Sequence, residues 1–198
     1  SLVEFANAVT QGVGRNGEHL YPALPYSAYN KMAPQDVADL KAFMDSLPAS
    51  AEASKPHKIG FPFNIRRSLG IWKLLFERSD WVIAGDLTRE QARGRYIAEA
   101  LAHCGECHTP RNVLGGLQLG KWLAGAPNPD GKGRTPNITP GKLSWTAADV
   151  VEYLTSGFTP EFDSVGGHMA HVVENMAKLP ESDRQAVAAY LQLVPAVN

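Results

Sequence analysis

Two stretches in the second half of the chain carry apolar residues at the spacing of an amphipathic helix. Residues 91–102 place apolar side chains on one face, at Ile97, Ala98, Leu101 and Ala102. Residues 181–193, which follow Pro180, place a similar stripe at Val187, Tyr190 and Leu191. Each stripe has to be covered, so we predict that these two helices cross.

A third helix is predicted between them, over residues 145–157. Thr146 and Asp149 have the spacing of a capping-box variant at its start, and Gly157 suits the position just after its end. Many of the 14 prolines and 18 glycines lie in residues 110–141, which predicts long loops there. The pattern as a whole predicts an all-α fold with much irregular chain.

Composition and charge narrow the class of protein. The 198 residues are 44% hydrophobic and 20% charged, as in soluble globular proteins of one large or two small domains. Nineteen basic and twenty acidic residues leave a net charge of −1, so nucleic acid is a poor candidate partner. No stretch approaches the roughly 18–20 consecutive apolar residues of a membrane-spanning helix.

The two cysteines, Cys104 and Cys107, lie in the sequence CGECH, which ends at His108. Three chemistries compete for this motif. A redox dithiol would follow β-rich runs, which the preceding sequence lacks. A structural zinc site needs four ligands, and without a second cysteine pair it would have to recruit His168 and His171.

The third chemistry is covalent attachment of haem, in which both sulfurs bond to the vinyl groups and the adjacent imidazole binds iron. The spacing suits it, because two intervening residues let one helical turn present both thiols to a single porphyrin edge. The sequence therefore favours one covalent haem on Cys104 and Cys107, with His108 as an iron ligand.

An iron that passes electrons without binding gases needs a second axial ligand. The candidates are Met169, Met176, His168 and His171. We predict Met169, because the two glycines before His168 let the chain pass close to a flat cofactor. Packing of Met169 in the core is the alternative. A methionine ligand would raise the reduction potential, whereas a second histidine would lower it.

The chain contains an internal repeat. A shift of 147 residues aligns Leu40, Phe43, Met44 and Leu47 with Val187, Tyr190, Leu191 and Val194, and a shift of 145 aligns Gly12 with Gly157. We therefore predict three segments. Residues 1–54 form a partial helical unit without a haem motif, residues 55–92 a connector between lobes, and residues 93–198 a complete unit.

Several further motifs occur in a characteristic order. They are LYPALPY at residues 20–26, FPFNIRR at 61–67, GRY at 94–96, HCGECHTPRN at 103–112 and PNIT at 136–139. Together they resemble the cytochrome c subunits of membrane-associated bacterial alcohol, aldehyde and related dehydrogenases, which are built from consecutive class I cytochrome c domains. The chain departs from that family in lacking a first haem motif and in having Leu24 where members often have methionine.

The resemblance implies a periplasmic c-type cytochrome that is not itself an enzyme. Such a subunit accepts single electrons from a dehydrogenase catalytic subunit and passes them toward the respiratory chain, to an oxidase, a quinone or another cytochrome. It also implies one haem c, with Met169 as the family's axial methionine. The alternative is a haem protein with an open sixth position that acts as a small-ligand sensor or a peroxidase-like enzyme.

Three more residues are candidates for the haem surroundings. The resemblance suggests that the Pro110 carbonyl accepts the ring N–H of His108 and so fixes its orientation. Arg111 is a candidate partner for a haem propionate, with a solvated surface arginine as the alternative. Asn137 either bonds a propionate, holds the loop over the haem, or forms an ordinary Asx turn.

Residues 65–76 combine basic with large apolar side chains. This segment could contact a membrane surface or a partner dehydrogenase. We expect instead that it lies across two packed lobes. If the chain associates with a membrane, we expect it to do so only through this segment or through partner proteins.

Overall fold

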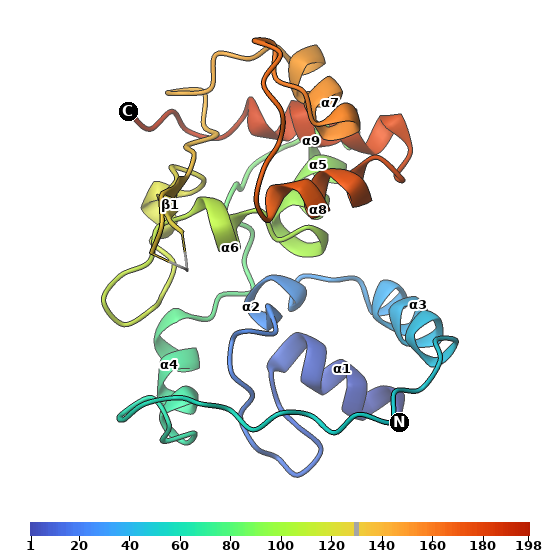
Figure 1. Ribbon diagram of the computed structural model, residues 1–198, viewed down its shortest axis with the longest axis vertical. Coiled ribbons are helices and arrows are strands. Elements are labelled where there is room, and N and C mark those ends of the chain that lie inside the picture. Colours follow the sequence, from blue (N-terminus) through green and yellow to red (C-terminus); the bar gives the residue numbers. More distant parts are fainter. Residues whose placement is uncertain (129–130) are drawn as a thin grey trace. The chain divides into compact units, whose positions relative to one another are not determined.

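The computed structural model describes residues 1–128 and 131–198 and divides the chain into two compact units, Ser1–Asp80 and Trp81–Asn198. Both units are mainly helical, as the sequence predicts (Figure 1). Residues 55–80 fall in the first unit and residues 81–92 in the second. The predicted division into residues 1–54, 55–92 and 93–198 stays a prediction.

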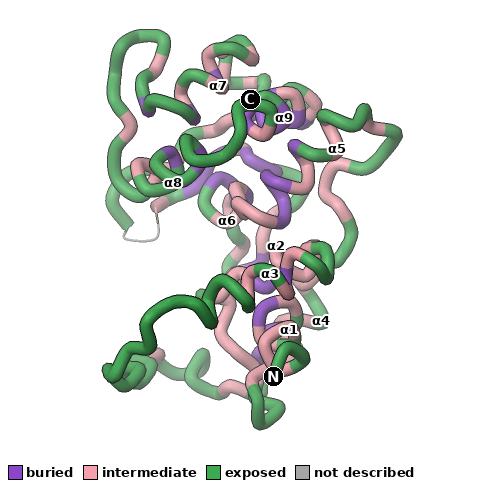
Figure 2. Tube along the Cα trace, turned by 90° about the vertical axis from the view of Figure 1, so that its right-hand side faces the viewer, coloured by how far each residue is buried: buried purple, intermediate pink, exposed green. Residues whose placement is uncertain are grey.

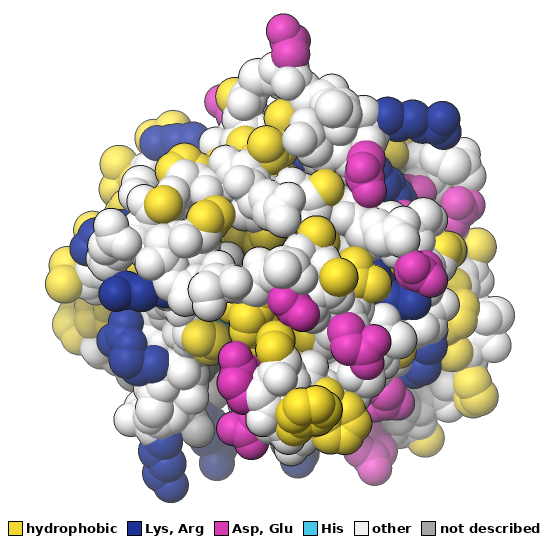
Figure 3. Space-filling model, turned by 90° about the horizontal axis from the view of Figure 1, so that it is seen from above, with side chains coloured by type: hydrophobic (Ala, Val, Ile, Leu, Met, Phe, Trp, Pro, Cys, Tyr) yellow, Lys and Arg dark blue, Asp and Glu magenta, His cyan; other side chains and the backbone are white. Residues whose placement is uncertain are grey.

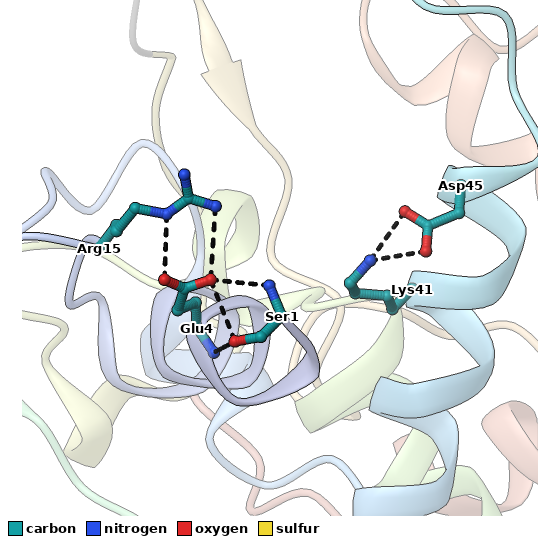
Figure 4. Close-up of polar contacts among 5 residues, drawn as sticks. All are labelled: Ser1, Glu4, Arg15, Lys41 and Asp45. Carbon is teal, nitrogen blue, oxygen red and sulfur yellow. Dashed lines mark hydrogen bonds and ion pairs between the residues drawn. The ribbon is translucent and has the colours of Figure 1, made fainter.

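The first unit contains α1 (Leu2–Gln11), α2 (Tyr26–Tyr29), α3 (Pro34–Asp45) and α4 (Ser68–Phe76). Helix α1 begins with a capping box between Ser1 and Glu4, and Arg15 pairs with the same glutamate (Figure 4). It ends at Gly12, whose φ of 59° is left-handed. Polar contacts thus define both ends of this helix.

The second unit begins with α5 (Arg89–Tyr96), which continues as a π-helical turn, η1 (Ile97–Leu101). The elements that follow are α6 (Gly105–His108), η2 (Leu119–Lys121), β1 (Ala126–Pro127), β2 (Arg134–Thr135), α7 (Ala147–Ser156), α8 (Met169–Met176) and α9 (Glu181–Leu191). The two short strands pair antiparallel, with Ala126 opposite Thr135.

The predicted crossing of the first and last helices of this unit is confirmed, because α5 packs against α9. Gly94 makes the close approach possible, since a Cβ at this position would collide with the backbone oxygen of Ala186. Arg93 and Asp183 form a salt bridge between the same helices at 2.8 Å. Buried residues of both helical segments, among them Ile97 and Leu191, belong to one core cluster. Buried stretches of the chain are seen near α9 in Figure 2.

The third predicted helix is also confirmed as α7. Its capping box joins Thr146 to Asp149, and it ends at Gly157 with a left-handed φ of 80°. The loop after α7 repeats the geometry of the loop after α1. Val165 N donates to Gly157 O at 2.7 Å, as Leu20 N donates to Gly12 O at 2.7 Å. The sequence repeat therefore has a structural counterpart in these helix–loop segments.

The surface carries both signs of charge, as the nearly balanced numbers of basic and acidic residues predict. The face of the molecule in Figure 3 carries basic and acidic side chains intermixed with small hydrophobic patches. No helix among the described residues is long and apolar enough to cross a membrane.

Candidate functional site

The CGECH motif occupies a single helical turn. His103 has a left-handed φ of 41° where the chain leaves the π-helical turn, and α6 follows at once. The amide of His108 donates to the carbonyl of Cys104 at 3.0 Å, so both cysteines lie on the same turn. Cys104 is partly buried, Cys107 is exposed, and neither thiol forms a disulfide.

The surroundings of these two thiols disfavour the thiolate form. Burial raises the pKa of Cys104 to about 11. Burial also raises the pKa of Cys107, and the nearby Glu106 carboxylate adds to the rise. A redox dithiol needs a lowered thiol pKa, and zinc binds thiolates. In the part of the chain that the structure describes, no three His, Cys, Asp or Glu side chains gather as metal ligands.

His108 is held as an iron ligand would need to be. Its side chain is buried, at 8% exposure, and burial lowers its pKa, which favours the neutral imidazole. Nδ1 lies 2.9 Å from the carbonyl oxygen of Pro136. With the proton on Nδ1, the ring donates to that carbonyl and Nε2 presents its lone pair to iron.

The interpretation of Pro110 is wrong in this respect. Pro136 accepts the His108 bond, while the Pro110 carbonyl accepts the amide of Gln118 at 2.9 Å. Pro110 lies two residues beyond the end of α6, and its carbonyl is turned toward the loop that leads to η2. The acceptor comes from a segment 28 residues away in sequence.

A set of loop contacts holds the Pro136 segment beside α6. Gly125 N donates to His108 O at 2.7 Å, and Ile138 N donates to Leu123 O at 3.0 Å. Asn137 forms an Asx turn, since its Oδ1 accepts the amide of Thr139 at 2.8 Å, and its Nδ2 donates to Val197 O at 2.8 Å. Asn137 therefore holds this loop against the chain near Val197. A bond from Asn137 to a propionate stays a prediction.

The structure distinguishes the candidates for the sixth ligand. Met169 is the first residue of α8 and is partly buried against the core that Cys104 also contacts. Met176 lies in that core as a buried residue. His171 is exposed and faces Glu174 at 3.8 Å. His168, which directly precedes α8, is exposed, so Met169 is the partly buried side chain among the four candidates. Ligation of iron by Met169 stays a prediction.

Arg111 lies beside the turn of the CGECH motif, where it forms an ion pair with Glu106 and donates to Gly115 O at 2.8 Å. Its guanidinium thus ties α6 to the following loop. Pairing of Arg111 with a propionate stays a prediction.

The segment over residues 65–76 contains α4, and two of its basic side chains bond within the first unit. Arg66 donates to His19 O at 2.8 Å, and Lys73 donates to Gly12 O at 2.7 Å. Ile71 and Leu74 are exposed. Contact of this segment with a membrane or a dehydrogenase stays a prediction.

Sequence reasoning missed two features of the site. One is Pro136, which no local pattern connects to His108. The other is a buried hydrogen-bond chain through Glu99, Tyr190 and Trp122. The sequence did contain a signal for this hydrogen-bond chain, because Glu99 is a charged residue among the apolar residues of the predicted helix 91–102.

Comparison with known proteins identifies the family, although no protein-family model matches the chain. The chain is 54% identical over its whole length to a "Diheme cytochrome c-type" protein of Cereibacter sphaeroides, of which it covers 67%. It is 38% identical over 99% of its length to the fructose dehydrogenase cytochrome subunit of Gluconobacter japonicus, of which it covers 41%. It is 31% identical over its whole length to the cytochrome c subunit of the quinone alcohol dehydrogenase of Gluconacetobacter polyoxogenes, of which it covers 45%.

The chain thus spans less than half the length of the two dehydrogenase subunits and two thirds of the diheme protein. A Cys-x-x-Cys-His turn that ends in a buried imidazole is the feature expected of a protein with the name cytochrome c. The sequence, the helical fold and these relatives agree, and the chain belongs to the family of cytochrome c subunits of bacterial dehydrogenases.

Proposed function

We propose that this chain carries one covalent haem c on Cys104 and Cys107, with His108 and Met169 as axial ligands. In the periplasm it would pass single electrons from a dehydrogenase catalytic subunit toward an oxidase, a quinone or another cytochrome. The observation that carries this proposal is one helical turn that presents two cysteines and ends in a buried imidazole whose Nδ1 lies 2.9 Å from Pro136 O.

The haem, when bound, supplies reversible one-electron chemistry at iron. The chain's own residues hold and tune it. The two cysteines fix the porphyrin edge, and the Pro136 carbonyl fixes the rotation of the His108 ring and makes its Nε2 a better donor. A thioether from Met169 favours the ferrous state and raises the reduction potential.

Relatives named as cytochrome subunits of fructose, alcohol and gluconate dehydrogenases support a dehydrogenase catalytic subunit as the electron donor. The periplasm is supported by the attachment chemistry, which bacteria carry out outside the cytoplasm.

The test is to produce the chain in the periplasm of a bacterium with c-type cytochrome maturation and to measure its intact mass and its spectrum. We expect the added mass of one haem, which Cys104→Ala together with Cys107→Ala should remove. Free thiols in the wild-type protein would contradict the proposal.

Met169 and Met176 form a matched pair for the sixth ligand. Met169→Leu should abolish the long-wavelength charge-transfer band that a thioether gives to ferric haem, and should open the ferrous iron to carbon monoxide. Met176→Leu, in the core, should keep the band. Carbon monoxide binding by the wild-type protein would favour the sensor or peroxidase-like alternative.

A further inference from the structure

Glu99 is the buried charge that the proposed electron transfer does not use. Its side chain comes from the π-helical turn Ile97–Leu101 and is 2% exposed, between the buried residues Ala98 and Ala100. Burial of a carboxylate is costly unless its oxygens are hydrogen-bonded. Single π-helical turns within α-helices occur often at functional sites. The position of Glu99 therefore calls for an explanation beyond packing.

Three donors converge on the Glu99 carboxylate. Oε2 accepts the amide of Val82 at 2.7 Å. Oε1 accepts the amide of Ile83 at 3.1 Å and the hydroxyl of Tyr190 at 2.8 Å. Both oxygens act as acceptors, which is the arrangement of an ionised carboxylate. Arg95 lies close by, since its guanidinium donates to the carbonyl of the same Ile83 at 2.9 Å.

Tyr190 connects Glu99 to the indole of Trp122. Its hydroxyl donates to Glu99 and accepts the indole N–H of Trp122 at 2.9 Å. Burial raises the pKa of Tyr190 above its ordinary value of 10.0, and the Glu99 carboxylate adds to the rise. The phenol therefore keeps its proton and links Glu99 to Trp122.

Trp122 in turn lies against the attachment turn. Its ring packs so closely on Gly105 that a Cβ there would collide with the indole. Gly105 stands between Cys104 and Cys107 in α6. A continuous chain of hydrogen bonds and packing thus runs from the 82–83 backbone, through Glu99, Tyr190 and Trp122, to the turn that carries both thiols.

We propose that Glu99 is a positioning residue for the haem: through Tyr190 it fixes the indole of Trp122 against Gly105, and its buried negative charge favours the oxidised iron. This inference rests on the proposed attachment at Cys104 and Cys107. Ferric haem carries one more positive charge than ferrous haem, so a nearby negative charge stabilises the ferric form. The core screens such a charge less than water does.

The experiment uses the haem-loaded full chain and three variants. Glu99→Gln removes the charge, and Glu99→Asp keeps the charge but shortens the reach to Tyr190. Asp183→Asn is the control, because it removes a carboxylate that is paired with Arg93 near the surface of the same unit. For each protein one measures the intact mass, the reduction potential and the Trp122 indole N–H resonance.

We expect Glu99→Gln to raise the reduced-to-oxidised ratio severalfold at a fixed ambient potential and to shift the Trp122 resonance through Tyr190. Glu99→Asp should shift the resonance with a much smaller change of potential. Asp183→Asn should change neither.

The inference is overturned if Glu99→Gln behaves as Asp183→Asn does. If Glu99→Gln yields no folded protein, Tyr190→Phe decides, because it keeps the ring and breaks the link between Glu99 and Trp122. An unchanged Soret circular dichroism signal in Tyr190→Phe would then overturn the inference. A wild-type mass without haem would instead overturn the attachment at Cys104 and Cys107.

Discussion

Gly94 determines how closely two helices of the second unit approach. A Cβ here would collide with the backbone oxygen of Ala186 and would lie 2.8 Å from Cβ of Tyr190. The first obstacle is backbone, so α9 itself would have to shift. We expect Gly94→Ala to lower the free energy of unfolding by about 1–3 kcal/mol in denaturant unfolding. Gly120 has open space around it and serves as the control. Equal effects of Gly94→Ala and Gly120→Ala would contradict this explanation of the crossing.

Asp183 makes the stability of the α5–α9 crossing depend on pH. Its hydrogen bonds from Arg93 hold the pKa of this carboxyl below its ordinary value of 3.8. A lowered pKa in the folded state means that the salt bridge stabilises the protein above that ordinary value, and that this stabilisation is lost as the pH falls through the folded pKa. We expect Asp183→Asn to cost about 0.2–1 kcal/mol at neutral pH, because Arg93 is half exposed.

The measurement is the melting temperature of the wild type and of Asp183→Asn across the acid range. Their difference should shrink toward zero as the pH falls below 3.8. A difference that stays constant with pH would show that Asp183 acts through packing rather than through its charge.

The helical turn of the CGECH motif could be predicted from sequence, whereas the acceptor of the His108 ring could not. Cys104, Cys107 and His108 are recognisable because their chemistry depends on spacing along one helical turn. Whether Pro110 or Pro136 accepts the His108 bond depends on the path of the loop that brings Pro136 back to α6. The Asx turn of Asn137 helps to hold that path, and the sequence alone does not reveal it.

At the scale of elements, α8 is held at its end by one arginine. Arg184 comes from α9, is buried, and donates to the carbonyls of Met176, Ala177 and Leu179, where α8 ends. The carbonyl of Met176 is one that a helix leaves without an intrahelical partner, and the carbonyls of Ala177 and Leu179 belong to the turn that follows. Because Met169 begins the same helix, we infer that Arg184 steadies the proposed ligand from the opposite end.

We expect Arg184→Met, which keeps much of the side-chain length, to loosen α8 before the rest of the unit. In a thermal scan of the haem-loaded protein, the charge-transfer band of Met169 ligation should then disappear at a lower temperature than the far-ultraviolet helix signal. In the wild type the two should be lost together. Coincident loss in the variant would show that Arg184 stabilises the whole unit instead.

Helices with clear end signals were predictable, and those without were not. Helix α7 has a capping box at Thr146 and a left-handed Gly157, and its predicted and observed ranges agree. Helix α8 was not predicted as a helix, because His168 at its start makes no capping bond. The π-helical turn was also missed, because the apolar spacing of Ile97 and its neighbours is compatible with an ordinary α-helix.

At the scale of the whole molecule, the internal repeat places two related helices, α3 and α9, in different surroundings. Tyr190, Leu191 and Val194 at the end of α9 are 0%, 9% and 3% exposed. Their counterparts in the repeat, at the end of α3, are Phe43, Met44 and Leu47, which are 61%, 50% and 50% exposed. The repeat itself could be found in the sequence, but this difference in burial could not, because it depends on whether a helix like α5 covers the apolar face.

The matched positions Leu47 and Val194 test what this difference means for stability. Val194→Ala removes buried methyl groups, and we expect a loss of about 1–2 kcal/mol in the free energy of unfolding. Leu47→Ala removes a larger group from an exposed position, and we expect a change within about 0.5 kcal/mol. Denaturant unfolding of both variants measures the contrast. A cost for Leu47→Ala as large as that for Val194→Ala would mean that the apolar face of α3 is covered in solution, because only the loss of a buried contact could produce it.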